Sequence, residues 1–358
     1  MGGQWARAHG MARPDLTIMG AGIFGLSIAW VAARRGAKVR VIDIHGIGAG
    51  SSGGPVGALS PHVPEAWNAK KAFQLDSLLM AESWWSAVEQ ASGLPTGYGR
   101  TGRLQPLADK AAVDIANTRQ SAAQILWRGL ADWQVVPTSG AAWGLQSPSG
   151  YVVSDTLTAR LNPTMALAAL ASAIVAAGGA IVIGNPAPVG PTIWATGADG
   201  LAQLSTALAQ PIGSAVKGQA ILLRHDARDQ PQLFVDGLHI VPHADGTVAI
   251  GSTSETRWTD PFSTDEQLDR LHQKAISACP QLRDAQVLLR WAGLRPRARS
   301  RAPILGPWPG NPGHFVANGG FKIGFGMAPK VAEVMVDLVL EDHDTIPPEF
   351  RIDASLRS

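Results

Sequence analysis

The sequence predicts an α/β protein of two domains, one assembled from separate stretches of chain and the other built on an antiparallel sheet. Three observations predict this architecture. A complete β-α-β unit lies near the start, a block of short antiparallel strands lies past the middle, and an α/β pattern returns towards the end. With 358 residues, the chain also exceeds the usual size of a single domain.

The β-α-β unit occupies residues 16–43. Leu16–Met19 is a short apolar run typical of a buried strand, and Gly20–Gly25 follows it. Residues 26–35 are rich in alanine with apolar spacing suited to a helix, which Gly36 is expected to end. Residues 38–42 predict a second strand, closed by Asp43.

The glycines of this unit form a G-x-G-x-x-G fingerprint. Gly20 permits the tight turn, Gly22 lets the backbone approach a diphosphate, and Gly25 lets the helix pack closely on the sheet. The N–H groups at the helix start, around Ile23 and Phe24, are expected to face the phosphates. Asp43 is expected to bind ribose hydroxyls, and its acidity disfavours a 2′-phosphate. The pattern predicts a Rossmann-like dinucleotide domain; the structural alternative is a glycine-rich turn without a ligand.

A loop rich in glycine and serine, residues 46–57, comes directly after the unit. Gly50, Ser51 and Ser52 in it are expected to wrap the ribityl chain and diphosphate of a long cofactor. This favours FAD over NAD, because many NAD enzymes continue with alternating helices and strands. An NAD-dependent dehydrogenase remains the weaker alternative.

The rest of the chain predicts further helices and strands. Helices are expected over residues 66–91, 107–133, 162–178, 265–278 and 323–341, and buried strands over 180–183 and 192–197. Short strands at 220–223, 233–235, 239–241 and 248–250 alternate with turns, of which Asp236-Gly237 and Asp245-Gly246 favour hairpins. Residues 303–324 are expected to hold strand and loop segments.

Composition narrows the functional class. The formal net charge of +2 argues against a dedicated nucleic-acid surface, and no apolar run reaches the roughly 18 residues of a spanning helix. The lone Cys279 allows no disulfide within the chain and no cysteine metal site, so a reducing, cytoplasmic location is expected. The histidines lack HxxxH or HxH spacing, so no metal site is expected. Residues 1–13 are expected to be a flexible leader without the apolar region of a secretory signal.

Five segments in order resemble the D-amino-acid oxidase superfamily of flavoproteins and, within it, the glycine oxidases. They are Gly20–Gly25 with Asp43; Gly50-Ser51-Ser52 through Gly57–His62; Ile193–Gly197; Ile240–His243 with Val248–Thr253; and Trp291–Pro296 through Pro303–Gly306, continuing into Phe315–Gly324 and Ala328-Pro329. The resemblance spans residues 15 to 342 and is most specific in its C-terminal part.

The resemblance implies a discontinuous FAD-binding domain (residues 14–62, 148–212 and 300–350) and a substrate domain (63–147 and 213–299) whose antiparallel sheet covers the flavin ring. It also implies further cofactor-binding residues: Gly57, Ala58, Leu59, Thr196, Gly197, Gly320, Phe321, Lys322, Ile323 and Gly324. The final helix would start near the flavin, where its dipole would stabilise the anionic reduced ring.

Four departures from the family pattern concern the substrate end. His239 stands where glycine oxidases carry an active-site tyrosine, Ser254 where they carry a methionine, and Lys322 where they carry a second arginine. The hairpin between the third and fourth strands is reduced to residues 185–191. These departures leave FAD binding intact and the identity of the substrate open.

Arg295, Lys322 and His239 are the candidate catalytic residues. Arg295 matches the family's substrate-binding arginine, and a planar guanidinium suits a substrate carboxylate; surface positions are expected for Arg297, Arg299 and Arg301. Lys322 could contact substrate or flavin or assist oxygen activation, or be a solvated lysine. His239 could hydrogen-bond the substrate or be a strand histidine with a satisfied partner. His62 lies close to the expected flavin loop without a clear role.

These residues predict an FAD-dependent oxidoreductase. It would oxidise the C–N bond of a small amino acid or secondary amine to an imine by hydride transfer to flavin N5, with O₂ or a quinone as electron acceptor. Residues 54–59 also resemble the oxidase half of an enzyme that processes carboxymethylaminomethyl uridine in tRNA, so a tRNA substrate is one alternative and a non-catalytic flavin-binding protein another. Five tryptophans (Trp84, Trp85, Trp127, Trp133 and Trp143) are expected to pack a core, or else to line an aromatic substrate site.

Overall fold

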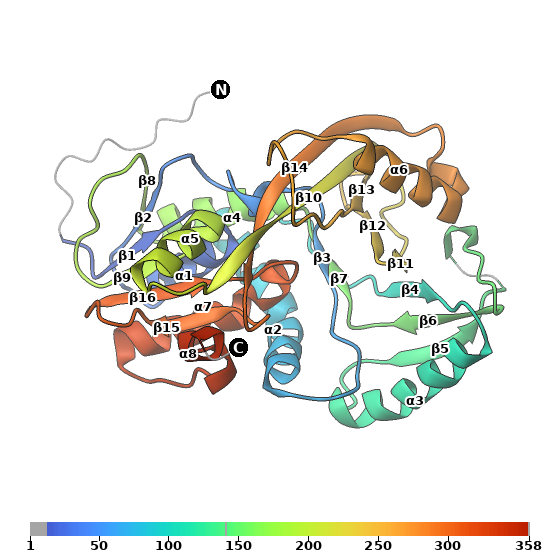
Figure 1. Cartoon of the computed structure of the whole chain (residues 1–358), viewed down its shortest axis with the longest axis horizontal. Coiled ribbons are helices and arrows are strands. Elements are labelled where there is room, and N and C mark those ends of the chain that lie inside the picture. Colours follow the sequence, from blue (N-terminus) through green and yellow to red (C-terminus); the bar gives the residue numbers. More distant parts are fainter. Residues whose placement is uncertain (1–12, 140–141, 357–358) are drawn as a thin grey trace.

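A computed structural model describes residues 13–139 and 142–356, and within them two large β-sheets and one two-stranded sheet (Figure 1). The expected leader, apart from residue 13, lies outside the described residues. One large sheet lies at the left of Figure 1 and the other at the right, and the long strands β10 (Gly213–Arg224) and β14 (Gln286–Ala298) of the right-hand sheet extend toward the left-hand one. This arrangement confirms the predicted α/β class.

The first large sheet has six strands in the order β15-β16-β9-β1-β2-β8. All neighbours are parallel except β15, which runs antiparallel to β16. Its strands are β1 (Leu16–Met19), β2 (Val39–Asp43), β8 (Ala180–Ile183), β9 (Thr192–Trp194), β15 (Ile304–Pro307) and β16 (His314–Asn318). Every residue of β1 is buried, as expected for a central strand covered on both faces.

Helices from distant parts of the chain pack beside this sheet. Helix α1 (Ile23–Arg34) packs against α4 (Pro163–Ala176) and α7 (Gly324–Glu341), while α5 (Gly197–Ala207) packs against β16. Gly36 follows α1 with a φ of 91°, a left-handed conformation that favours glycine and ends the helix as predicted. The short α8 (Ile352–Leu356) packs on β15.

The second large sheet has eight strands in the order β14-β10-β13-β12-β11-β4-β6-β5. They are β4 (Arg103–Pro106), β5 (Trp133–Pro137), β6 (Tyr151–Asp155), β10 (Gly213–Arg224), β11 (Gln232–Val235), β12 (Leu238–Pro242), β13 (Thr247–Gly251) and β14 (Gln286–Ala298). The predicted hairpins are confirmed: β11–β12 and β12–β13 are antiparallel, and Asp236 and Gly237 both have positive φ, as a type I′ turn requires.

The remaining elements are helices and short segments that lie between or beside the strands of the two large sheets. Helix α2 (Ala69–Ser92) packs on α4 and α7, α3 (Lys110–Leu126) packs on β5, and α6 (Glu266–Ala278) packs on β10, β12 and β13. Strands β3 (Ala58–Leu59) and β7 (Ala159–Arg160) form the two-stranded sheet. Single-turn helices occupy Ser51–Gly53 (η1), Ala142–Gly144 (η2), Pro280–Leu282 (η3) and Pro348–Phe350 (η4). None of the described helices is long and apolar enough to cross a membrane.

Several predicted boundaries were wrong. The helix expected over residues 107–133 ends at Leu126, because Trp133 begins β5. The strand expected over 192–197 ends at Trp194, and Gly197 opens α5 with a φ of 61°. Strands β4, β5, β6 and β14 were not predicted. The division into domains stays a prediction, although β6, inside the interval 148–212, pairs in the eight-stranded sheet.

Strand β14 contains Arg295, the candidate substrate-binding residue, and β10 is its neighbour in the sheet. They pair along their whole lengths, from Gly213 opposite Ala298 to Arg224 opposite Gln286. Arg295 therefore lies opposite Val216, and side chains alternate between the two faces of this ribbon. The first half of β14 is an exposed edge, and the second half, which holds Arg295, is mostly buried.

Candidate active site

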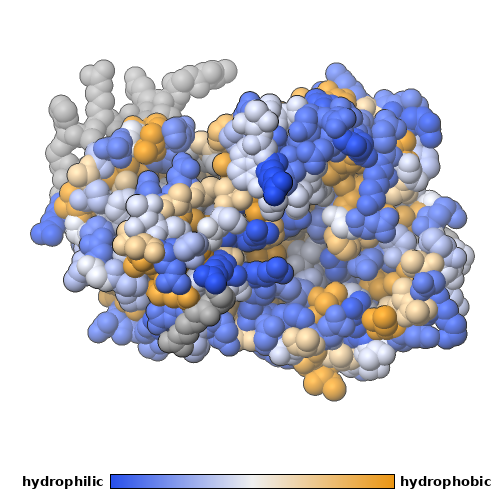
Figure 2. Space-filling view, in the orientation of Figure 1, coloured by the Kyte–Doolittle hydropathy of each residue, from blue (hydrophilic) through white to orange (hydrophobic). Residues whose placement is uncertain are grey.

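A cavity of about 800 Å³ lies between the two large sheets, within the range of pockets that hold cofactors and substrates. The face seen in Figure 2 is mostly hydrophilic and is hollowed near its centre, between the parts that carry the two sheets. The cavity walls come from the start of α1, the loop 42–63, the end of β9, the strands β12 and β14, and residues 317–326.

At one end of the cavity the glycine fingerprint is fixed by backbone packing. Gly20 has a φ of 108°, and a Cβ there would lie 2.4 Å from the carbonyl oxygen of Ala195. A Cβ on Gly25 would lie 1.9 Å from the carbonyl oxygen of Gly20. Only glycine allows this close approach of α1 to the sheet, which leaves Gly22 and Ile23 at the cavity wall.

Asp43 lies at the end of β2 beside the fingerprint. Its Oδ2 accepts a hydrogen bond from the N–H of Ala21 at 2.7 Å, and its Oδ1 accepts from His45 and Gly46 at 2.8 and 2.9 Å. These three backbone donors fix the carboxylate in place at the cavity wall. A fixed carboxylate suits the hydroxyls of a ribose.

Hydroxyl groups at this end fit a polar cofactor. Ser52 Oγ accepts from the N–H of Ile23 at 3.0 Å, which joins the serine loop to the start of α1. Thr196 and Ser60 line the cavity, and their buried hydroxyls have no hydrogen-bond partner among the described residues. Buried hydroxyls are normally hydrogen-bonded, so these two fit a ligand with polar atoms, as FAD has.

The segment before α7 forms another wall. Asn318 Nδ2 donates to the carbonyl of Gly197 at 2.9 Å, and the N–H of Phe321 donates to the carbonyl of Pro296 at 3.0 Å. Phe321 has a φ of 44°, so the chain turns sharply before α7 begins at Gly324. These bonds aim the start of α7 at the cavity.

Most of the predicted cofactor residues line this one cavity: Gly20, Gly22, Ile23, Phe24, Asp43, Gly50, Ser51, Ser52, Ala58, Thr196, Gly197, Gly320, Phe321, Lys322, Ile323 and Gly324. Gly25, Gly57 and Leu59 lie behind its wall. A Cβ on Gly57 would lie 1.8 Å from the carbonyl oxygen of Leu161, and Leu59 is fully buried. The contacts of these three are packing contacts that support the wall.

Arg295 reaches the other end of the cavity from β14. It is 7% exposed, and its Nη1 and Nη2 donate to the carbonyl of Thr253 at 3.3 and 3.2 Å. Burial lowers the pKa of Arg295 to about 10, against a raising influence of Glu255. The guanidinium lies across Gly218 of β10, where a Cβ would come within 1.5 Å of Nη2. Gly218 therefore provides the space that the guanidinium fills.

Lys322 and His239 line the same cavity as Arg295. Partial burial and the charge of Arg295 lower the pKa of Lys322 to about 8. Burial, with Arg103 and Lys322 nearby, lowers the pKa of His239 to about 3, so this imidazole is neutral. His239 Nδ1 is buried and has no hydrogen-bond partner in residues 13–139 and 142–356, and the centroid of its ring lies 4.7 Å from that of Phe234.

Charges are separated along the cavity. Among the described residues that line it, the carboxylates are Asp43 and Asp199, both beside the six-stranded sheet, and the Lys and Arg side chains are Arg103, Arg295 and Lys322. Arg103 is paired with Asp155 at 2.8 Å. No ion pair within residues 13–139 and 142–356 involves Arg295 or Lys322. This end of the cavity therefore favours an anion.

Aromatic side chains that the sequence analysis did not assign to the site also line the cavity. The Trp291 ring lies between Gly54 and Gly293, where added Cβ atoms would come within 3.0 and 2.5 Å of it. Phe234 and Phe262 complete the aromatic wall. Gly293, two residues after Trp291 in the sequence, was the available signal that the indole ring packs directly against the backbone. Phe262 follows an irregular loop and gave no periodic signal.

The five tryptophans singled out from the sequence are all buried in the core, as the first of the two interpretations predicted. Of the three neighbouring arginines, Arg299 and Arg301 are exposed and Arg297 is half-buried. His62 lines the cavity with its Nδ1 bonded to Gln74 Oε1, and burial lowers its pKa.

The fold and the glycine fingerprint at this cavity define a dinucleotide-binding α/β protein. Residues 15–338 match the family DAO, described as FAD dependent oxidoreductase. The chain therefore belongs to this family of FAD-dependent oxidoreductases, and FAD is its cofactor.

Several relatives are glycine oxidases. The glycine oxidase of Geobacillus kaustophilus is 25% identical, over 91% of this chain and 93% of the relative. That of Pseudomonas aeruginosa is 35% identical over 134 residues, so the match spans 37% of either chain. The bifunctional protein ThiO/ThiG of Nostoc is 27% identical, and the match covers 91% of this chain and 53% of the relative. The matches thus cover 37% of the length of the Pseudomonas aeruginosa relative and 53% of that of the Nostoc relative.

Solved structures share the fold. The glycine oxidase of Geobacillus kaustophilus superposes with a TM-score of 0.82 at 21% identity, over 96% of this chain and 99% of that chain. The iminodiacetate oxidase of Chelativorans sp. BNC1 gives the same score and identity over 94% and 98%. These similarities place both sheets and their connections in one known architecture.

Proposed function

We propose that this protein oxidises the C–N bond of a small amino acid or secondary amine that carries a carboxylate, giving an imine that water hydrolyses. The observation that carries the proposal is Arg295, a buried guanidinium at the cavity wall whose hydrogen bonds go to one backbone carbonyl. A buried cation without a carboxylate partner is costly, and a carboxylate that binds it bidentately offsets that cost. The glycine oxidases and iminodiacetate oxidase named above act on substrates of this kind.

The residues at the other end of the cavity fit FAD. The start of α1 would hold the diphosphate, Asp43 the ribose, and the hydroxyls of Ser52 and Thr196 further polar atoms. When bound, FAD would supply the two-electron acceptor for the hydride that leaves the carbon next to nitrogen, and the amine would lose a proton to give the imine. O₂ or a quinone would then take the electrons.

The side chains at the substrate end then have separate tasks. Arg295 binds the carboxylate and so fixes the direction in which the amine points, since positioning dominates this kind of oxidation. Lys322 adds a second positive charge while it is protonated. His239, being neutral and unpartnered at Nδ1, can hydrogen-bond the amine without repelling it.

An anaerobic titration tests the proposal. The FAD-loaded protein would be mixed with glycine, sarcosine, proline and D-amino acids, and the flavin absorbance followed. We expect at least one of these amines to bleach the flavin, which would also exclude a non-catalytic flavin protein. A full panel that leaves the flavin oxidised would contradict the proposed function.

Lys322 should give carboxylate binding a pH dependence. Its pKa of about 8 in the ligand-free protein means that the positive charge is present below pH 8 and is lost above it. We therefore expect the affinity for a simple carboxylate such as acetate, which has no titrating amine, to fall about fivefold as pH rises from 7 to 9. The measurement is a titration of flavin absorbance at each pH.

Two variants check that Lys322 causes this change. Lys322→Arg keeps its charge throughout and should flatten the profile, whereas Lys322→Met should bind acetate weakly at every pH. If the acetate affinity of Lys322→Met still falls as the pH rises through 8, the titrating group is not Lys322.

A further inference from the structure

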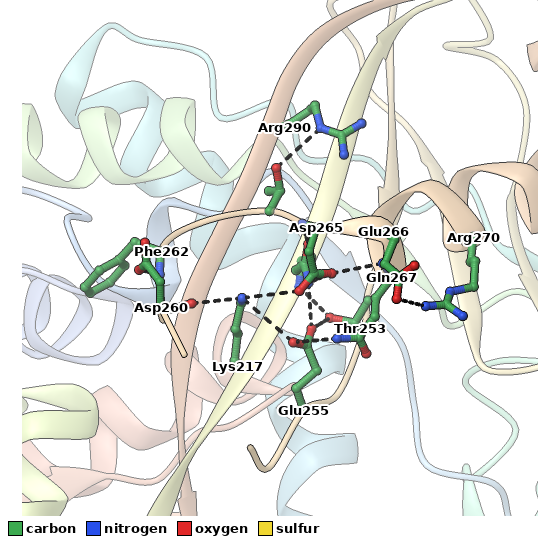
Figure 3. Close-up of polar contacts among 12 residues, drawn as sticks. Lys217, Thr253, Glu255, Asp260, Phe262, Asp265, Glu266, Gln267, Arg270 and Arg290 are labelled. Carbon is green, nitrogen blue, oxygen red and sulfur yellow. Dashed lines mark hydrogen bonds and ion pairs between the residues drawn. The ribbon is translucent and has the colours of Figure 1, made fainter. Parts of the chain in front are cut away.

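A group of polar side chains surrounds Lys217 on β10 (Figure 3). Lys217 does not line the cavity. Lys217 is 2% exposed, and its Nζ lies 3.8 Å from Glu255 Oε2 and 3.9 Å from Asp265 Oδ2. Gln219, fully buried, donates from Nε2 to both carboxylates, at 3.0 Å to Glu255 and 2.8 Å to Asp265. We name Lys217, Gln219, Thr253, Glu255 and Asp265 the Lys217 network.

The Lys217 network and Arg295 lie on opposite faces of the β10–β14 ribbon. Side chains alternate along β10, so Lys217 and Gln219 point to one face and Gly218 to the other. The guanidinium of Arg295 lies over Gly218, on the cavity face. No residue of the network lines the cavity, so the network has no direct contact with a ligand there.

Thr253 connects the two faces. Its backbone is held by Gln219, whose carbonyl accepts from the Thr253 N–H at 3.2 Å and whose N–H donates to Thr253 Oγ1 at 2.8 Å. The Thr253 hydroxyl donates to Glu255, and its carbonyl accepts both hydrogen bonds from Arg295. The carbonyl that holds Arg295 is therefore fixed by the network behind it.

A second arm of the network reaches another part of the cavity wall. Lys217 Nζ donates to the carbonyl of Asp260 at 2.9 Å, and Asp260 Oδ1 accepts from the N–H of Phe262 at 2.8 Å. Phe262, labelled in Figure 3, lines the cavity. Lys217 thus contacts the segment that follows β13 at two points, Glu255 and Asp260.

Charge balance gives a reason for burying Lys217, Glu255 and Arg295, whereas Asp265 lies on the exposed side of the group. Two cations, Lys217 and Arg295, lie near two carboxylates, Glu255 and Asp265. Glu255 raises the pKa of Arg295 against the lowering effect of burial, yet it does not reach the guanidinium as an ion-pair partner. Arg295 therefore keeps its charge, and the N–H groups that do not donate to Thr253 remain available to a ligand.

We propose that Lys217 and Glu255 are positioning residues for Arg295, which act through the Thr253 carbonyl to aim the guanidinium into the cavity. The proposal rests on the proposed function, because it takes Arg295 to be the carboxylate-binding group. A misplacement of about 1 Å at such a group can lower binding and catalysis by orders of magnitude.

Lys217→Met and Glu255→Gln test the proposal in the full-length, FAD-loaded protein. The probe is acetate, and its dissociation constant is measured from the change in flavin absorbance. We expect acetate to bind about tenfold more weakly to each variant, at unchanged FAD content. Lys110→Met, the same substitution at an exposed lysine of α3, is the matched control and should bind acetate as the wild type does.

The pH profile separates positioning from general loosening of the fold. Loss of the Glu255 charge removes an influence that raises the pKa of Arg295, so the upper pH limit of acetate binding should be lower in Glu255→Gln than in the wild type. A loosened fold alone would weaken binding without moving that limit. Thr253→Val, which removes the connecting hydroxyl and no charge, replaces Lys217→Met if that variant does not fold.

The outcomes distinguish this proposal from the one on which it rests. If the wild-type protein binds acetate and the variants bind it equally well, the positioning role is overturned and the proposed function stands. A wild-type protein that neither binds acetate nor is reduced by amines would overturn both.

Discussion

Replacing Arg295 by methionine should abolish carboxylate binding in the FAD-loaded protein while FAD itself stays bound. The guanidinium is the buried cation at the substrate end, and loss of one partner of a buried, hydrogen-bonded charge pair costs about 2–5 kcal/mol. We therefore expect affinity for acetate, and kcat/KM for an amino-acid substrate, to fall by about 10²- to 10³-fold. Flavin absorbance titration and steady-state kinetics measure the two quantities.

The fold should tolerate this change. Arg295 has no ion-pair partner among the described residues and its burial disfavours the charged form, so methionine should leave the melting temperature unchanged or higher. Arg290→Met is the matched control, since Arg290 lies on the same strand but pairs with Asp269 on the surface. An Arg295→Met protein that binds acetate normally would remove the basis of the proposed function.

Gly218→Ala should weaken carboxylate binding almost as strongly, although Gly218 makes no contact with a ligand through a side chain. The new Cβ would lie 1.5 Å from Nη2 of Arg295 and 2.2 Å from its Cζ. Because the clash is with the far end of a flexible side chain, the guanidinium should move and the strand should stay. We expect affinity for acetate to fall about 10- to 100-fold, with little change in thermal stability.

A double-mutant cycle shows whether the alanine acts through Arg295. If it does, Gly218→Ala combined with Arg295→Met should be no weaker in acetate binding than Arg295→Met alone. Additive losses in the double variant would mean that Gly218 affects the cavity by another route, such as the neighbouring ring of Trp291.

The cofactor end of the site was largely predictable from the sequence, because its signals are local. Strand, glycine turn, helix and Asp43 follow one another within one β-α-β unit, and the geometry that each requires is short-range. The hairpin turn at Asp236-Gly237 was predictable for the same reason, since its residues adopt the positive φ that the turn needs. Arg295, Lys322 and His239 became candidates only through the family resemblance, and their roles stay predictions that the variants above test.

The errors fall where long-range contacts decide the structure. Residues from Trp133 onward form a strand because they pair with β6. The helix before them ends at Leu126, so its helical pattern does not continue to Trp133. Strand β14 was missed because its exposed first half contains the apolar run Val287–Leu289, which interrupts the alternation of polar and apolar residues.

By itself, the sequence determined the nucleotide-binding unit, the α/β class and the hairpins, since these depend on neighbours in the chain. Tertiary structure alone decided that Gly218 makes room for Arg295, that Thr253 holds its guanidinium and that Lys217 lies behind both. Those contacts join β10, β14 and the segment after β13 by strand register, and register is set by the pairing of distant strands.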